Sequence, residues 1–191
     1  MGKGRLEAFS DGVIAVIITI MVLEMKAPHG TDLHSLVPVL PVFANYTLSF
    51  VFIAIYWNNH HHMLAAVQRI DGRVMWTNLH LLFWLSLVPF VTSSMGENHF
   101  AAVPTALYGI VLLMSALAYT ALQTAIVACN GHDSKLAAAV GNDLKGKVSV
   151  ACYLAAIPLA FFVQWIADAL FVIVAIIWFL PDRRIERQVT E

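Results

Sequence analysis

The sequence predicts an all-α integral membrane protein whose six transmembrane helices form one domain over residues 1–191. Of the 191 residues, 60% are hydrophobic and only 12% are charged. A soluble domain has about 45–50% apolar and about 25% charged residues. The apolar residues also gather in six segments whose lengths approach the roughly 20 residues needed to span a bilayer. Together these observations favour a multi-pass membrane protein.

The six expected helices are joined by short loops, which leave no room for a soluble domain. Their approximate ranges are 8–25, 36–58, 74–94, 101–129, 147–165 and 167–181. Pro89 and Pro158 fall inside the third and fifth segments, where proline predicts a kink. The fifth and sixth segments almost touch, and Gln164–Asp168 is the expected turn between them. The longest loop, 130–146, is polar and predicts a cytoplasmic linker.

Basic residues fall almost entirely on one side of this arrangement. If the N-terminus is cytoplasmic, the outer side receives only Lys26. The inner side receives the other ten basic residues: Lys3, Arg5, Arg69, Arg73, Lys135, Lys145, Lys147, Arg183, Arg184 and Arg187. Because cytoplasmic loops carry an excess of Lys and Arg, both termini are expected in the cytoplasm. The basic tail, residues 181–187, is expected to anchor at the lipid headgroups.

The first helix has an apolar stripe and a separate polar contact. At about 100° per residue, one side carries Phe9, Gly12, Val13, Val16, Thr19, Ile20 and Leu23. Asp11 falls about 140° from Val16, and Ser10 lies between the two faces. Periodicity alone does not distinguish a pore-lining stripe from a face that packs inside the bundle, so both interpretations stay open at this point.

The cytoplasmic end of the first helix lies at the depth of two other polar segments. The second helix ends with Trp57–His62, and the third begins with Trp76–His80. Polar groups in a bilayer need hydrogen-bond partners. We therefore expect Ser10 and Asp11 to join a network that ties the first helix to its neighbours.

A histidine cluster raises the alternative of a membrane-embedded metalloenzyme. His60, His61 and His62 are consecutive, so on a helix they point about 100° apart and cannot all reach one ion. His80 and Asp11 could complete a site. Nucleophile motifs, a Walker loop and a dinucleotide-binding glycine motif are absent from the sequence. We therefore expect no enzymatic activity, no catalytic residue, no metal, no cofactor and no nucleic-acid partner.

Several motifs resemble one family. Arg5-x-x-x-Phe9-Ser10-Asp11 is similar to the signature of the lysosomal potassium channel called transmembrane protein 175 and of its bacterial relatives. Three further patterns are similar to the family's: Trp57-x-x-His60-His61, Asn78-Leu79 and Leu87-x-Pro89-Phe90. The resemblance covers nearly the whole chain, although the last three helices contribute little that is diagnostic.

The resemblance implies a potassium-permeable, leak-like cation channel in a plasma membrane. Four copies of the first helix would surround the axis of a homotetramer. The family's narrowest point lies five positions after the motif aspartate, which is Val16, and further apolar rings correspond to Ile20 and Leu23. Thr19 would add a pore-lining hydroxyl. Because valine is smaller than the expected isoleucine or leucine, the first ring would be wider, and which of the three rings is narrowest stays open.

The resemblance also implies an interhelical network outside the conduction path. Its members would be Arg5, Phe9, Ser10, Asp11, Trp57, His60 and Asn78. Helical periodicity instead places Arg5 on the stripe side, near the inner mouth. A proton pathway is a further alternative, because relatives are thought to pass protons, but the apolar stripe offers no relay.

Overall fold

The computed structural model describes residues 2–131 and 143–179, and within these ranges the regular structure is entirely helical. The all-α prediction is therefore confirmed for the described chain. In chain order the helices are α1 (Lys3–Leu23), the short 3₁₀ helix η1 (Leu33–Val39), α2 (Leu40–Ala65), α3 (Gly72–Ser86), α4 (Val88–Glu97), α5 (Ala102–Asn130), α7 (Leu144–Phe162) and α8 (Gln164–Phe179).

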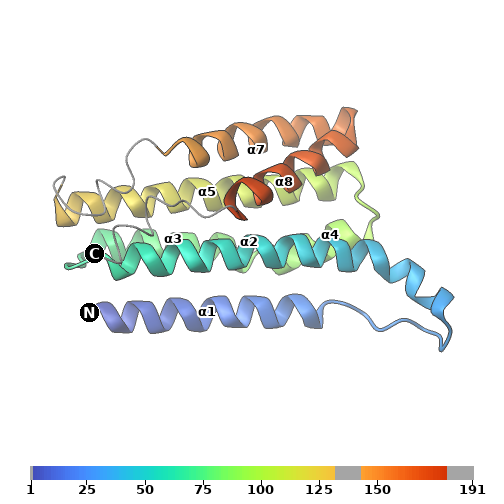
Figure 1. Ribbon diagram of the computed structural model, residues 1–191, viewed down its shortest axis with the longest axis horizontal. Coiled ribbons are helices and arrows are strands. Elements are labelled where there is room, and N and C mark those ends of the chain that lie inside the picture. Colours follow the sequence, from blue (N-terminus) through green and yellow to red (C-terminus); the bar gives the residue numbers. More distant parts are fainter. Residues whose placement is uncertain (1, 132–142, 180–191) are drawn as a thin grey trace.

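The helices run back and forth along one axis, so their basic ends meet. Figure 1 shows the start of α1, the end of α2 and the starts of α3 and α7 at the same end of the bundle. We call this the basic end, because the described loops and first turns there carry Lys3, Arg5, Arg69, Arg73, Lys145 and Lys147. Lys135, the tail 181–187 and most of the expected linker lie outside the described residues.

The opposite end carries Lys26, which follows α1. Its ammonium lies 2.9 Å from a carboxylate oxygen of Glu97 at the end of α4. The hydrogen bond to Glu97 raises the pKa of Lys26 above its ordinary value. The ends of α1 and α4 thus lie together, away from the basic end, as the charge pattern requires.

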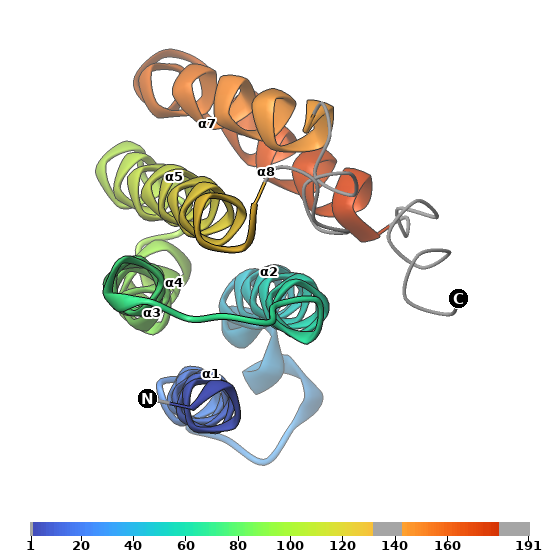
Figure 2. The ribbon, with the colours of Figure 1, turned by 90° about the vertical axis from the view of Figure 1, so that its left-hand side faces the viewer.

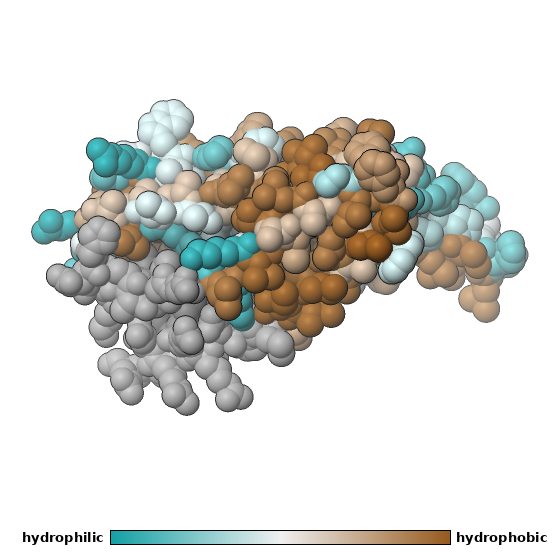
Figure 3. All heavy atoms as spheres, turned by 90° about the horizontal axis from the view of Figure 1, so that it is seen from above, coloured by the Kyte–Doolittle hydropathy of each residue, from teal (hydrophilic) through white to brown (hydrophobic). Residues whose placement is uncertain are grey.

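The chain is a multi-pass membrane protein. Within residues 2–131 and 143–179, five helical segments are long and apolar enough to cross a bilayer, and α8 is apolar but shorter, with 16 residues. Figure 3 shows a broad hydrophobic surface between two more hydrophilic ends. This distribution is what a hydrocarbon layer around the middle of the bundle requires.

Several helix boundaries differ from the prediction. α1 begins at Lys3 rather than at residue 8, and α2 continues past 58 to Ala65, so the histidine triplet lies inside a helix. The expected helix 74–94 is two helices, α3 and α4, that meet at Leu87. Pro89 lies at the start of α4, where its missing N–H breaks the ladder of hydrogen bonds.

The turn between α7 and α8 is shorter than expected. α7 continues through Pro158 to Phe162, and only Val163 separates it from α8. The Val163 N–H donates to the Leu159 carbonyl at 2.7 Å, which closes the last turn of α7. The prediction of a turn over Gln164–Asp168 was wrong, because these residues form the first turns of α8.

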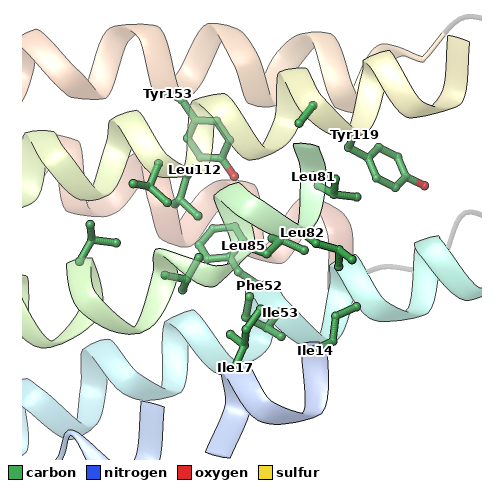
Figure 4. Close-up of a cluster of buried hydrophobic side chains, with 14 of the residues drawn as sticks. Ile14, Ile17, Phe52, Ile53, Leu81, Leu82, Leu85, Leu112, Tyr119 and Tyr153 are labelled. Carbon is green, nitrogen blue, oxygen red and sulfur yellow. The ribbon is translucent and has the colours of Figure 1, made fainter. Parts of the chain in front are cut away.

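α1 lies at one edge of the bundle. Figure 2, an end-on view, shows α1 beside α2 and the α3–α4 pair, with α5, α7 and α8 on their far side. Ile14 and Ile17 point from α1 toward Ile53 and Leu85 in the core (Figure 4), and all four side chains are buried. One face of α1 is therefore packed and the rest faces outward.

A buried polar cluster holds α4 behind α1. The Asn45 amide donates to the Thr92 carbonyl at 2.7 Å, and the Thr92 hydroxyl donates to Ser49 Oγ at 2.7 Å. Ser49 Oγ also lies 2.9 Å from the hydroxyl of Tyr108 on α5. Because such bonds strengthen in a low-dielectric interior, this cluster joins α2, α4 and α5 into one support.

Candidate functional site

The buried face of α1 is defined by residues spaced three or four apart: Leu6, Ser10, Ile14, Ile17 and Met21. This is the spacing of a helix stripe that packs on a core. The only polar member, Ser10, is completely buried. The sequence placed Ser10 between two faces, and the structure places it on the packed one.

The predicted pore stripe lies on the outward side of α1. Val16, Ile20 and Leu23 are 56%, 41% and 75% exposed, whereas the neighbouring Ile14 and Ile17 are 2% and 3% exposed. The stripe is therefore not the face of α1 that packs within the chain. From Val16 to Leu23 it extends about 10 Å along the helix axis.

Thr19 is the only residue of α1 with a hydroxyl group on this outward side. Its Oγ1 donates a hydrogen bond of 2.9 Å to the Ala15 carbonyl one turn earlier. Because the hydroxyl hydrogen is engaged with the helix, the lone pairs of Oγ1 remain for an outside group. Thr19 can thus act as an acceptor toward a cation or water.

A directed chain of hydrogen bonds runs behind the stripe, from α2 through α3 to α1. His60 Nε2 lies 2.7 Å from Asn78 Oδ1, and the Asn78 amide donates to Ser10 Oγ at 3.0 Å. Ser10 Oγ then donates to the Leu6 carbonyl at 2.9 Å. Because Asn78 Oδ1 can only accept, His60 carries its proton on Nε2. All three side chains are buried, so this series of hydrogen bonds fixes which face of α1 points inward.

Two further bonds attach the basic end of α1 to α2. Trp57 Nε1 donates to Asp11 Oδ1 at 3.0 Å, close to the protein surface. Lys3 Nζ donates to the Ala65 carbonyl at 2.8 Å, which satisfies an orphan carbonyl at the end of α2. Of the predicted network, the structure thus brings together Ser10, Asp11, Trp57, His60 and Asn78.

Arg5 and Phe9 lie outside this network in the protomer. Arg5 is exposed, and no described residue forms a hydrogen bond or ion pair with its guanidinium. Phe9 is 48% exposed on the same side as the stripe. The helix wheel placed both on that side, and both lie there in the structure.

The sequence did not single out Asn130, which fixes the turn between α2 and α3. Its Oδ1 accepts from the N–H groups of Gln68 and Arg69 at 3.0 and 2.9 Å, and its amide donates to the Arg69 carbonyl at 3.1 Å. Asn130 ends α5. An asparagine at a helix end beside a short turn was the available signal.

The histidines are engaged with other partners. His80 Nε2 accepts from Trp84 Nε1 at 2.9 Å, and His61 stacks on Trp57 with ring centroids 5.9 Å apart. His60 is bonded to Asn78. In the described ranges, no three His, Cys, Asp or Glu side chains are grouped as metal ligands.

Replacing Asn78 with alanine is expected to destabilise the protein. The change leaves the buried His60 Nε2 without its acceptor and removes the donor to Ser10 Oγ, at a cost of about 2 kcal/mol or more. The thermal midpoint of the purified protein in detergent should fall by about 4 °C or more. Asn58→Ala is the matched control, because Asn58 is exposed on α2 and its loss should change stability by less than about 0.5 kcal/mol. Equal thermal midpoints for Asn78→Ala and Asn58→Ala would contradict a stabilising role of the hydrogen bonds from His60 to Ser10.

Comparison with known proteins places this geometry in context. The profile of the family described as "Endosomal/lysosomal potassium channel TMEM175" matches residues 5–89, which include α1 and the network. A potassium channel of Chryseobacterium sp. (strain P1-3) is 51% identical over all 191 residues, which is the full length of both chains. The endosomal/lysosomal proton channel TMEM175 of Danio rerio is 26% identical over 66% of this chain and 24% of its own length.

A solved structure has the same fold. It is the crystal structure of a lysosomal potassium-selective channel TMEM175 homolog from Chamaesiphon minutus, with a TM-score of 0.77 and 28% identity. The match covers 93% of this chain and 96% of that one. On the full-length identity to the Chryseobacterium channel and the shared fold, the chain belongs to the TMEM175 family of channels.

Proposed function

We propose that this chain is the subunit of a potassium-permeable, leak-like channel whose pore is lined by the outward stripe of α1. The observation that carries the proposal is the split of α1 into two faces. One face is packed and bonded through Ser10, while the other presents Val16, Thr19, Ile20 and Leu23 outside the protomer. Relatives named as potassium channels support the ion.

A pore needs several copies of α1, because one outward stripe encloses nothing. We infer a homotetramer in which four copies surround the axis, since four are what the family pattern implies. The edge position of α1 in Figure 2 supports this, as neighbouring protomers can meet there without disturbing the bundle. The membrane would be the plasma membrane, and both termini and the basic end would lie on its cytoplasmic side.

The mass of the assembly tests the proposed subunit number. Four chains of 21.0 kDa have a mass of 84 kDa. Native mass spectrometry of protein released from detergent should show this species as the main one. A predominant monomer or dimer would contradict the tetramer.

The stripe would control permeation through dehydration. An apolar ring excludes water when it is narrow, so a cation that crosses it must shed part of its hydration shell. Potassium is more weakly hydrated than sodium and therefore crosses at lower cost. Thr19 Oγ1, whose hydrogen is bonded to Ala15, offers an oxygen that replaces some of the lost water between the rings at Val16 and Ile20.

Asparagine in the stripe is expected to increase cation flux. Ile20→Asn places a polar side chain in the ring, so water can enter it. A barrier to potassium that is lower by about 1.4 kcal/mol gives about tenfold faster potassium entry into sealed vesicles. Selectivity over sodium should fall in the same variant, because a hydrated ion then passes. Val172→Asn, at a 45% exposed valine on α8, is the control and should leave flux unchanged. If wild-type vesicles show no potassium flux and Ile20→Asn has no effect, the pore assignment is wrong.

Proton conduction is the second candidate, because relatives in several vertebrates are named as proton channels. A vesicle assay with a pH gradient and no potassium separates the two functions. We expect slow acidification that does not depend on the protein, since the stripe itself has no titratable group. Fast acidification that Ile20→Asn accelerates would instead assign protons to the same pore.

A further inference from the structure

A small pocket with a cavity volume of about 40 Å³ lies near the basic end, on the far side of the bundle from α1. Helices α2, α5, α7 and α8 all contribute to its walls. Among the described residues that line it, the aromatic ones are Phe52, Tyr56, Tyr119, Tyr153 and Trp178, and the only charged one is Asp143. The pore proposed above does not use this pocket.

The aromatic rings form a cage with fixed geometry. Tyr56 and Tyr119 meet edge to face with ring centroids 5.9 Å apart, as do Phe52 and Tyr153 at 6.4 Å. Trp178 Nε1 donates to Ser149 Oγ at 2.8 Å, which sets the orientation of the indole. Figure 4 shows the Tyr153 ring pointing from α7 into the bundle, toward Phe52. Rings held in this way lose little conformational freedom when an occupant binds.

The pocket is also lined by polar groups, among them the hydroxyls of Tyr56 and Tyr153 and the carboxylate of Asp143. No described residue forms a hydrogen bond with the hydroxyl of Tyr56 or of Tyr153, although Tyr153 is only 2% exposed. Asp143 caps α7 by accepting from the Gly146 N–H at 2.9 Å through Oδ1. It has no ion-pair partner among the described residues. Neither hydroxyl is sealed off, since the fully buried side-chain atoms without a partner among the described residues are Asn45 Oδ1 and Asp168 Oδ1. Both hydroxyls can therefore bond to water or to an occupant.

One of these rings already attracts an ammonium group. Lys145 Nζ lies 5.9 Å from the centroid of Trp178, within the range of a cation–π interaction. Its charge at the rim also opposes any second cation. Asp143 and Lys145 should therefore affect the binding of a cation in opposite directions.

We propose that this pocket binds a small organic ammonium group of the choline or ethanolamine type. Aromatic cages with a nearby carboxylate are suited to such cations, because the ring faces carry partial negative charge and the methyl groups fill apolar space. The group can be a free amine on the side of the basic end or the headgroup of a phospholipid in the adjacent leaflet. The recognition chemistry is the same for both sources.

The test compares choline with its neutral isostere, 3,3-dimethyl-1-butanol, by calorimetric titration of the purified full-length protein. Choline should bind more tightly than the isostere. Asp143→Asn keeps the cap of α7, because Asn also caps helices well, but should weaken choline binding about tenfold and leave the isostere unchanged. Lys145→Gln should strengthen choline binding. Asp71→Asn, which alters the equivalent cap of α3, should have no effect.

Nanodiscs distinguish the two sources. If phospholipid is the occupant, choline should bind more weakly in phosphatidylcholine discs than in phosphatidylglycerol discs, because the headgroup competes. Equal affinity assigns the site to free amines. Equal affinity for choline and the isostere, an unchanged affinity in Asp143→Asn, or the absence of binding by either probe would overturn the proposal.

Discussion

The Asn78 side chain fixes the rotation of α1, and the rest of the candidate site depends on that rotation. Its amide binds Ser10 and its carbonyl oxygen binds His60. A helix turned by one residue shifts every side chain by about 100°; the bond between Ser10 and Asn78 would then break and the buried Asn78 amide would lose its acceptor. Leucine and isoleucine contacts alone tolerate such a shift far better, because apolar packing is not directional. The polar chain therefore determines which residues form the outward stripe.

Hydropathy predicted the approximate position of the apolar segments, because bilayer thickness sets segment length. It could not predict the break at Val163, since Phe162 and Gln164 flank it without a glycine, a proline or an asparagine. The end of α2 was also missed. Asn58–His62 is polar, and a hydropathy argument ends a helix where apolar residues end. The helix continues to Ala65, because backbone hydrogen bonds within α2 extend that far. The Lys3 ammonium donates to the Ala65 carbonyl at its end.

The candidate site was partly predictable for a similar reason. A helix wheel separates Val16, Ile20 and Leu23 from Asp11 without any structure, and those three residues are outward in the protomer. The wheel could not show that Ser10, rather than Asp11, is the buried polar contact. That distinction depends on where Asn78 lies on α3. Which ring is narrowest stays a prediction, because ring width in the proposed tetramer would depend on the packing of the four copies and on side-chain size together.

Exposure of an apolar stripe would not by itself argue for a pore, since lipid accepts leucine and isoleucine as readily as protein does. The other residues on that side make the argument. Arg5 is exposed at the head of the stripe, at the basic end, with no partner among the described residues, and a charge without a partner favours contact with water. Gly12 leaves its backbone uncovered, and Thr19 offers oxygen lone pairs outward. A lipid-facing side gains nothing from these groups, whereas a side that meets water and cations uses all of them.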